Sequence, residues 1–231
     1  MSVTAVPSKF SASFLPLPPF VRKTLKVAGL CLLGYVALWL AATLGMLGVH
    51  VWAGKEAPTG TRVAGINHFE PVDGHLWRGS APREAGYRAL ADRGVRTVVD
   101  LRAEDLSARA LAEPARAGLA SVRIPIRDGQ TPTPAQVDTF LKTMKTSDGP
   151  VFVHCGAGVG RTGSMASAYL VRTGQASSQQ AALRTLAVGP PSIEQVYYVL
   201  SSDRHHSQQP PAVVEGVSRF LDAPRRIKAS L

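Results

Sequence analysis

One short glycine-rich stretch carries two side chains suited to phosphate chemistry, a cysteine and an arginine. Residues 151–163 read V-F-V-H-C-G-A-G-V-G-R-T-G, with Cys155 at the start of the loop and Arg161 at its end. A thiolate is a strong nucleophile and is stabilised near helix N-termini and cations. A guanidinium binds two phosphate oxygens at once. These residue types therefore favour attack by sulfur on a phosphate monoester.

The residues around this loop predict a strand before it and a helix after it. Residues 151–153 are apolar and follow Gly149-Pro150, whereas residues 164–171 form a helix-forming run. The glycines between them let the backbone take angles at which successive N–H groups converge on one anion, beside the positive end of the helix. The residues expected to bind the phosphate are Gly156, Ala157, Gly158, Val159, Gly160 and Arg161.

The pattern H-C-x5-R followed by threonine resembles the loop of the cysteine-based protein tyrosine phosphatases, and the short domain resembles their dual-specificity branch of bacterial type. The resemblance implies that Cys155 is the nucleophile and that Arg161 stabilises the transition state. It also implies that Thr162 hydrogen-bonds the sulfur, that His154 orients the loop through the backbone, and that Gln195 orients the hydrolytic water. The alternative is a glycine-rich turn with an inert, buried cysteine.

A second catalytic group is needed because an alkoxide is a poor leaving group and its oxygen must be protonated. Asp128 follows the expected strand over residues 122–126, so it would lie at a neighbouring strand end. The run P-I-R-D-G-x-x-P resembles the general-acid loop of small dual-specificity phosphatases, although its spacing to Cys155 is a few residues shorter than usual. Two alternatives remain: Asp128 only caps the turn at Gly129, or the acid is Asp138 in the next helical pattern.

Strands and helices alternate along the domain. The expected strands are residues 75–78, 95–101, 122–126 and 151–153, and the expected helices are 80–93, 104–118, 134–144, 164–173, 178–186, 192–200 and 212–222. This alternation predicts an α/β fold with a central, mostly parallel sheet of four to five strands flanked by helices. Asp73-Gly74 predicts a hairpin turn. In such a sheet the chemistry gathers at the carboxyl ends of the strands.

Three charged residues at predicted strand ends also belong to patterns that resemble the family. Arg78, in G-H-L-W-R-G-S-A-P, either helps to shape the active site or bonds loop carbonyls as a structural arginine. Asp100 and Arg102, in D-L-R, pair with each other or with the backbone of the catalytic loop. We interpret all three as scaffold residues.

Composition excludes several other classes of function. The chain has 231 residues and a formal charge of +10, but it has no basic run with interleaved aromatic residues, so no nucleic-acid partner is expected. Its two cysteines, Cys31 and Cys155, form no C-x-x-C pair, and no G-K-[ST] nucleotide loop is present. No metal site and no organic cofactor are expected.

A long uncharged run near the N-terminus predicts a transmembrane helix. The expected organisation is a cytoplasmic, disordered segment 1–26, the transmembrane helix 27–53, a linker 54–73, the phosphatase domain 74–202, and a C-terminal helix with a basic tail 203–231. A helix of about 20 apolar residues crosses a bilayer, and Trp52 stands where interfacial aromatics are common. The alternative is a signal sequence cleaved after Val51-Trp52-Ala53.

Flanking charge predicts the orientation of this helix. Lys9, Arg22, Lys23 and Lys26 precede it without any acid, whereas fewer basic residues follow it closely. The positive-inside rule then predicts a single-pass membrane protein with an extracytoplasmic catalytic domain. The family's domain is most often cytoplasmic, which stands against this orientation.

The sequence as a whole predicts a phosphomonoester hydrolase of the protein tyrosine or dual-specificity type, acting through a cysteinyl-phosphate. Its expected partners are a phosphorylated protein or lipid and the membrane, the latter through residues 27–53. One alternative is a lipid or inositol phosphate phosphatase with the same mechanism. An alternative of another class is an inactive phosphate-binding scaffold module.

Overall fold

The computed structural model describes residues 18–57 and 61–230, without the side chains of residues 61, 62 and 224–230. Most of the N-terminal segment predicted to be cytoplasmic and disordered, residues 1–17, therefore lies outside the described residues. The chain divides into two units, residues 1–42 and residues 43–231, and each is described by itself.

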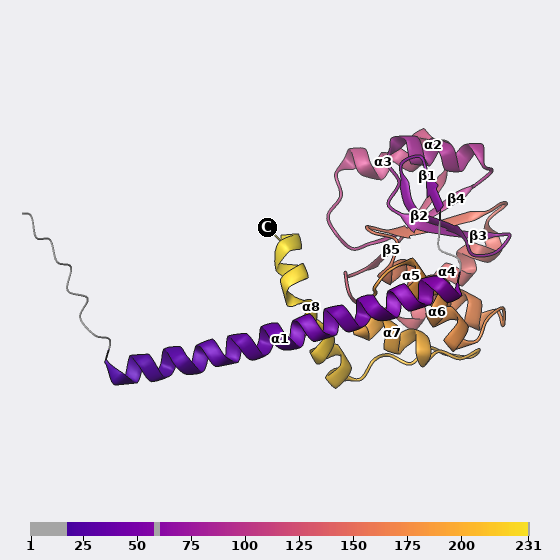
Figure 1. The fold of residues 1–231 in the computed structure, drawn as a ribbon. Helices are drawn as coiled ribbons and strands as arrows, with labels where there is room; N and C mark the ends of the chain where they lie inside the picture. Colours follow the sequence, from indigo (N-terminus) through magenta and orange to yellow (C-terminus); the bar gives the residue numbers. More distant parts are fainter. Residues whose placement is uncertain (1–17, 58–60, 231) are drawn as a thin grey trace, which may run out of the picture. The chain divides into compact units, whose positions relative to one another are not determined.

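The centre of the second unit is a β-sheet in the order β1-β2-β3-β6-β4-β5 (Figure 1). Its strands are β1 Thr61–Val63, β2 Ile66–Pro71, β3 Leu76–Ser80, β4 Thr97–Arg102, β5 Ala120–Ile126 and β6 Val151–Cys155. The neighbours β3 and β6, β6 and β4, and β4 and β5 pair in parallel, while β1 and β2 pair antiparallel at one edge. This arrangement confirms the predicted mostly parallel α/β sheet.

The N-terminal edge of the sheet contains strands that the sequence did not predict. The linker predicted for residues 54–73 is shorter in the structure, because residues 61–71 contain strands β1 and β2. The hairpin turn predicted at Asp73 is present between β2 and β3, where Asp73 Oδ1 accepts the N–H groups of His75 and Leu76. The sheet therefore has six strands within the described residues instead of the predicted four to five.

Helices cover both faces of the sheet, as predicted. Figure 1 shows α2 Glu84–Asp92 and α3 Ala108–Arg116 on one face. The other face carries α4 Pro134–Thr146, α5 Gly160–Arg172, α6 Ser178–Val188 and α7 Ile193–Leu200. A hydrophobic cluster fills each interface, one around Phe152 and Leu90 and the other around Val153, Phe140 and Met165.

Two helices begin later than their patterns predict, and both differences matter for the site. α2 begins at Glu84 because Ser80 still belongs to β3 and the N–H of Ala81 bonds to the carbonyl of Gly156. α3 begins at Ala108 because Ser107 caps it by accepting the N–H of Ala110. The residues between β4 and α3 are therefore a loop and not the first turn of a helix.

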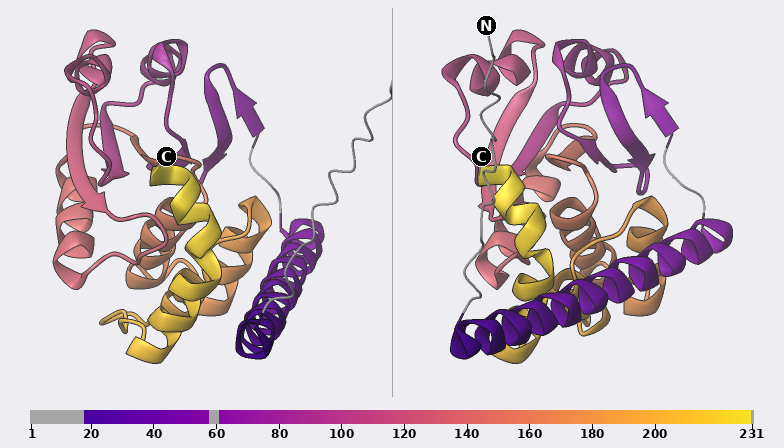
Figure 2. Two further views of the ribbon diagram at one scale, coloured as in Figure 1. Left: turned by 90° about the vertical axis from the view of Figure 1, so that its left-hand side faces the viewer. Right: turned by 60° about the vertical axis from the view of Figure 1, so that its left-hand side comes forward.

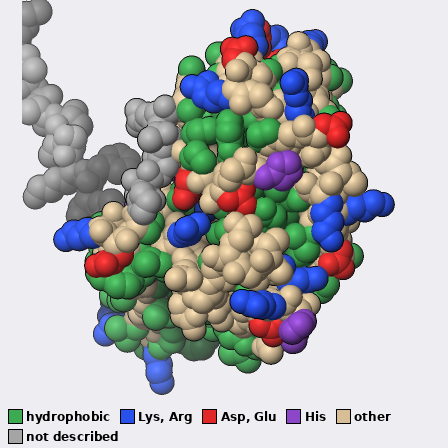
Figure 3. Space-filling view, turned by 90° about the vertical axis from the view of Figure 1, so that its right-hand side faces the viewer, with side chains coloured by type: hydrophobic (Ala, Val, Ile, Leu, Met, Phe, Trp, Pro, Cys, Tyr) green, Lys and Arg blue, Asp and Glu red, His purple; other side chains and the backbone are tan. Residues whose placement is uncertain are grey.

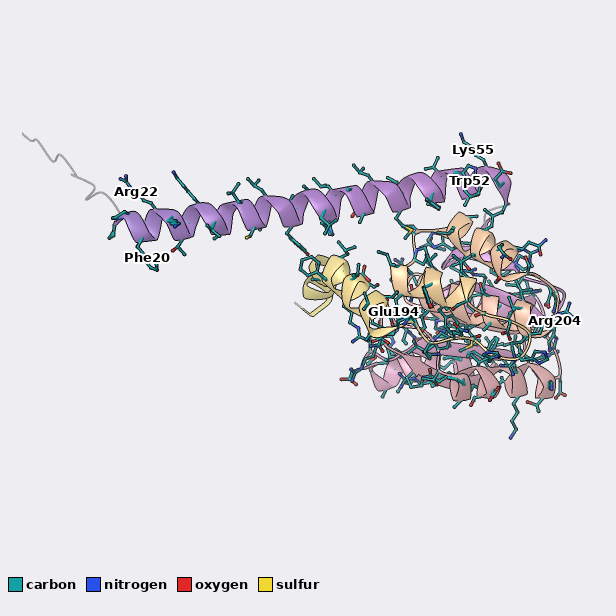
Figure 4. The ribbon with its side chains drawn as sticks, turned by 90° about the horizontal axis from the view of Figure 1, so that it is seen from below. Phe20, Arg22, Trp52, Lys55, Glu194 and Arg204 are labelled. Carbon is teal, nitrogen blue, oxygen red and sulfur yellow. The ribbon has the colours of Figure 1, made fainter. Side chains whose placement is uncertain are left out.

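The helix α1, Pro19–Glu56, has 38 residues and begins earlier than predicted, since proline is tolerated at a helix start. Phe20 and Arg22 lie at one end and Trp52 and Lys55 near the other (Figure 4). Its length and composition make it a candidate membrane span, the one such helix in the described part of the chain. At about 57 Å it is longer than a hydrocarbon core of about 30 Å requires.

The last turns of α1 belong to the second unit. Ala53 is fully buried against Leu186 and Ala187 of α6, with Met46 packed beside them. His50 Nδ1 lies 2.6 Å from the carbonyl oxygen of Leu186. This oxygen is among the last four carbonyls of α6, which have no partner within the helix. The last turns of α1 therefore supply a hydrogen-bond partner to a carbonyl at the C-terminal end of α6.

The C-terminal helix α8, Ala212–Ser230, is longer than the predicted 212–222 and lies beside α7 (Figure 2). The hydroxyl of Ser218 accepts the N–H of Glu194 and joins the two helices. On the face of the molecule drawn in Figure 3, lysine and arginine side chains are scattered among apolar and acidic ones. That face shows no single basic stripe of the kind that nucleic-acid-binding proteins use.

Candidate active site

The glycine-rich loop lies at the carboxyl edge of the parallel strands. Cys155 is the last residue of β6 and is 3% exposed, beside Ser80 at the end of β3. The loop runs from Gly156 to the start of α5 at Gly160, so this helix begins four residues earlier than the predicted 164–173 and includes Arg161. The N–H of Gly158 donates to Cys155 Sγ at 3.3 Å. The sulfur therefore lies among the backbone N–H groups of the loop and the N-terminus of a helix, which is a ready-made anion site.

The outer side of the loop is bound by the β2–β3 hairpin and the residue after it. The contacts are Ala81 N–H to Gly156 O at 3.0 Å, His68 Nδ1 to Ala157 O at 2.9 Å, Arg78 Nη2 to Gly158 O at 2.9 Å, and Arg78 Nη2 to Val159 O at 3.3 Å. Because the C=O and N–H of a trans peptide point in opposite directions, carbonyls held on the outside turn the following N–H groups inward. The hairpin thus fixes the loop in an anion-binding conformation.

Arg78 has both of the roles that its sequence pattern allows, because it bonds carbonyls and also shapes the active site. It is 2% exposed and bonds carbonyls, as a structural arginine does, but those carbonyls belong to the candidate phosphate loop. Burial lowers the pKa of Arg78, and the carboxylate of Glu70, 3.9 Å from its Nε, partly offsets this effect. Arg78 is therefore a scaffold residue of the loop itself.

Gly158 is required by the space and the backbone at the centre of the loop. Its φ of +78° lies in the left-handed region, and a Cβ there would come within 2.3 Å of the backbone of Gly79. We predict that Gly158→Ala lowers the free energy of unfolding by about 3 kcal/mol, from backbone strain and overpacking together. Urea denaturation measures this loss. Gly156→Ala is the matched control, since the nearest atom there is Arg161 Nη2 at 3.7 Å, and an equal loss in both variants would contradict the prediction.

Arg161 lies in the first turn of α5 and is 3% exposed. Glu104 holds its guanidinium through two bonds of 2.8 Å, from Nη1 and Nη2, and the carbonyl of Ile126 accepts from Nη1 at 3.0 Å. Burial acts to lower the pKa of Arg161, but the bonds to Glu104 and the negative charges of Cys155, Glu104 and Asp128 together outweigh it, and the pKa is raised. The buried Nε has no hydrogen-bond partner among the described residues. Glu104 thus binds Nη1 and Nη2 of the guanidinium, and Nε can donate a hydrogen bond to an oxyanion.

Glu104 is a site residue that the sequence did not predict. The sequence predicts that Glu104 begins a helix, whereas the structure places it in the loop between β4 and α3. Hydrogen bonds from Arg161 lower the pKa of Glu104, so its carboxylate stays charged beside the guanidinium. One signal was available: Glu104 closely follows Arg102 at the carboxyl end of β4, the edge at which Cys155 also lies.

Asp128 lies near the same edge, in the loop after β5, with Oδ1 3.4 Å from Arg161 Nη2 and its side chain 47% exposed. The structure therefore brings Cys155, Arg161 and Asp128 to one place. The runner-up, Asp138, lies on α4, where it is 65% exposed and 3.5 Å from Arg172 at the end of α5.

The loop that carries Asp128 is held by the start of α7. Ser192 Oγ donates to the carbonyl of Gly129 at 2.8 Å, and Gln195 Nε2 donates to the carbonyl of Gln130 at 3.0 Å. Gln195 Oε1 accepts the N–H of Ser192 in a capping box. A Cβ on Gly160 would come within 2.2 Å of that Oε1, so Gln195 packs directly on the start of α5. Its predicted role in orienting water remains a prediction, since both amide atoms already serve the scaffold.

His154 and Thr162 flank the loop and are both fully buried. His154 Nδ1 lies 3.2 Å from the carbonyl of Cys155 and 3.9 Å from Asp100, whose carboxylate pairs mainly with Arg102. These contacts match the scaffold interpretation of His154, Asp100 and Arg102. The hydroxyl of Thr162 makes no hydrogen bond within the described residues, so its predicted bond to sulfur remains a prediction.

The burial of His154 predicts a loss of stability in mild acid. Burial is the main cause that lowers the pKa of His154 from 6.5 to about 4. Between these values the unfolded chain binds a proton that the folded chain does not, so the stability present above pH 6.5 falls as the pH falls. Between about pH 7 and about pH 5, His154→Asn should lose about 2 kcal/mol less than the wild type in urea denaturation. Equal losses in both proteins would contradict this prediction.

Comparison with known proteins places this site in a family. A model described as PTP-NADK, a DSP-PTPase phosphatase fused to NAD⁺ kinase, matches residues 62–210. Probable NAD kinase 2, chloroplastic, of Oryza sativa subsp. japonica is 32% identical over 117 residues, which cover 47% of this chain and 12% of that protein. The dual specificity protein phosphatase CDC14C of Homo sapiens is 44% identical over 45 residues, which cover 20% of this chain and 10% of that protein.

The similarity to these curated relatives spans only about a tenth of their length. Among solved structures, the core catalytic domain of the PP-IP phosphatase SIW14 from S. cerevisiae shares the fold, with 15% identity and a TM-score of 0.50 over 68% of this chain and 92% of that one. Because the family model matches well over half of the sequence and contains the whole loop described above, the chain belongs to this family of DSP-type phosphatase domains.

Proposed function

We propose that the protein is a phosphomonoester hydrolase of the protein tyrosine or dual-specificity type that works through a cysteinyl-phosphate. One observation carries the proposal. The guanidinium of Arg161 is clamped by Glu104 on one edge, while its buried Nε has no partner in the described part of the chain. That nitrogen lies in the first turn of α5, directly after the loop in which Gly158 N–H donates to the sulfur of Cys155. A phosphoryl group between sulfur and guanidinium would satisfy both.

In the first step the thiolate of Cys155 attacks phosphorus, so that a sulfur–phosphorus bond forms while the bond to the leaving oxygen breaks. Asp128 gives its proton to that oxygen. The N–H groups of residues 156–161 and the side chain of Arg161 bind the equatorial oxygens, where charge is held in the transition state. No metal ion or organic cofactor is required for this step.

In the second step water attacks phosphorus and the sulfur–phosphorus bond breaks. Asp128, now a carboxylate, takes a proton from the water, and inorganic phosphate leaves with the thiolate restored. In this scheme Gln195 helps to orient the water and Thr162 donates a hydrogen bond to the departing sulfur. His154 acts only on the conformation of the loop.

We infer that the substrate is a phosphorylated protein, with a phosphorylated lipid or inositol as the alternative. The loop side chains are Gly, Ala and Val, so they add no lysine that would recognise a highly anionic inositol phosphate. The candidate membrane span α1 supports the lipid alternative, because it would keep the domain close to a bilayer. Comparing turnover of phosphotyrosine peptides with that of phospholipid vesicles tests the choice.

Hydrolysis of an aryl phosphate by the whole chain, in detergent, tests the proposed class. We expect turnover that inorganic phosphate inhibits competitively. The opposing proposal is an inactive phosphate-binding module, which would bind inorganic phosphate without any turnover. Binding without hydrolysis would therefore reject the enzyme and support the module.

The acid role of Asp128 has its own signature. We predict that Asp128→Asn lowers kcat about 10²-fold with an alkyl phosphate, whose leaving oxygen needs a proton, and much less with an activated aryl phosphate. Asp138→Asn is the matched control and should behave as the wild type. An Asp128→Asn variant with unchanged activity on both substrates would remove Asp128 as the acid.

We propose that α1 anchors the protein as a single membrane span with the catalytic domain outside the cytoplasm. Arg22, Lys23 and Lys26 at the start of α1 support this orientation. The packing of Ala53 under α6 argues against cleavage after that residue, because cleavage would detach the last turns of α1 from the domain. A reporter active only in the cytoplasm, fused after Leu231, should remain silent. An active reporter would reverse the orientation.

A further inference from the structure

His68 has an unusual backbone conformation for its residue type. Its φ is +53°, the one positive φ of a non-glycine residue within residues 18–57 and 61–230. This left-handed region costs most residues about 1–2 kcal/mol and is tolerated best by Gly, Asn, Asp and His. His68 lies in β2, and the neighbouring N–H of Asn67 donates to Ser80 Oγ at the end of β3. This hydrogen bond ties the residue before His68 to the end of β3.

The imidazole contacts the candidate phosphate loop. His68 Nδ1 lies 2.9 Å from the carbonyl oxygen of Ala157, and the side chain is exposed. The neighbouring carbonyls are held differently, by the backbone N–H of Ala81 or by the buried Arg78. His68 is therefore the exposed member of this set of donors.

The contact acts on one particular peptide group. The carbonyl of Ala157 and the N–H of Gly158 belong to the same planar unit, so their directions are coupled. That N–H donates to Cys155 Sγ at 3.3 Å. If this peptide rotated by half a turn, its carbonyl oxygen would point at the sulfur, and Gly158 offers a backbone that tolerates such rotation.

We propose that His68 is a positioning residue that locks the Ala157–Gly158 peptide with its N–H toward the sulfur. Donation from Nδ1 to the Ala157 carbonyl holds the oxygen outside the loop. Without this bond, the population with the oxygen turned inward rises, and that population repels both a thiolate and a phosphate oxygen. The inference rests on the proposed function for its consequence in catalysis, but not for its effect on phosphate binding.

Two substitutions separate the hydrogen bond from the backbone conformation. His68→Gly keeps the left-handed φ and removes the donor. His68→Asn also tolerates this φ, and its amide nitrogen lies close to where the imidazole Nδ1 lies. His205→Asn, an exposed histidine in the connection before α8, is the matched control.

Equilibrium binding of inorganic phosphate to the whole chain in detergent is the primary measurement, and kcat/KM for an aryl phosphate is the second. We expect His68→Gly to bind phosphate about tenfold more weakly, the value of one hydrogen bond of about 1.4 kcal/mol, with a similar loss in kcat/KM. His68→Asn should stay within about threefold of the wild type. Thermal unfolding, measured in parallel, should show that both variants are folded.

The outcomes are distinguishable. Wild-type binding by His68→Gly, or an equal loss in His68→Asn and His68→Gly, would overturn the positioning role. A wild-type chain that binds phosphate but hydrolyses nothing would defeat the proposed function, while the binding series would still test the role of His68.

Discussion

Replacing Cys155 with serine is expected to lower kcat/KM for an aryl phosphate by on the order of 10⁴-fold or more. A serine hydroxyl stays protonated near neutral pH and lacks an adjacent base here, because the neighbouring His154 is buried and faces the backbone. The phosphate loop itself should be preserved. We therefore expect Cys155→Ser to bind inorganic phosphate with nearly the affinity of the wild type.

The chain offers a matched control for this experiment. Cys31 lies in the part of α1 that belongs to the first unit and is exposed, so Cys31→Ser makes the same chemical change at a cysteine that is not part of the loop. Cys31→Ser should retain full activity. If Cys155→Ser and the wild type hydrolysed the substrate at equal rates, sulfur could not be the nucleophile.

Replacing Arg161 with lysine is expected to lower kcat/KM by about 10³-fold. Lysine keeps the charge but loses the planar fork, so it cannot bind Glu104 in two places and present a further N–H to the phosphate. The fall in kcat/KM would then come from the loss of the planar guanidinium and not from the loss of a positive charge. Most of the loss should appear in kcat, because Arg161 binds the phosphoryl oxygens more strongly in the transition state than in the bound substrate.

Arg102→Lys is the control for the second prediction, because Arg102 is also held by a carboxylate but pairs with Asp100 instead of Glu104. Arg102→Lys should lower kcat/KM only slightly. Glu104→Gln should fall between the two variants, since it keeps one acceptor for the Arg161 clamp. Equal activity of Arg161→Lys and the wild type would mean that two-point recognition by the guanidinium is not needed.

Local sequence predicted the loop well because its parts are contiguous. Cys155, the glycines and Arg161 follow one another between an apolar strand and a helix, so their spacing alone brings them together. Asp128 was found by a longer argument, that parallel strands end at one edge of the sheet. The fold class followed from the alternation of strands and helices, and the structure confirms it.

The missed features depend on contacts between distant parts of the chain. Glu104 meets Arg161 only after β4 and β6 pair, and the loop before α3 looks like helix until the cap at Ser107 is known. His68 lies in a segment predicted to be a linker. Its positive φ and its contact with Ala157, 89 residues further along the chain, are not indicated by the residues around it. Non-local pairing of this kind leaves no periodic signal in the sequence.

The most direct test of a cysteinyl-phosphate is to trap it. The whole chain would be mixed with a phosphorus-labelled aryl phosphate, quenched in acid within the first turnover, digested and analysed by mass spectrometry. Asp128→Asn should accumulate more of the intermediate, because it lacks the base for the second step. We predict one phosphoryl group on the peptide that contains Cys155, and none in Cys155→Ser. Turnover without any phosphoryl group on that peptide, or a group on another residue, would contradict the mechanism.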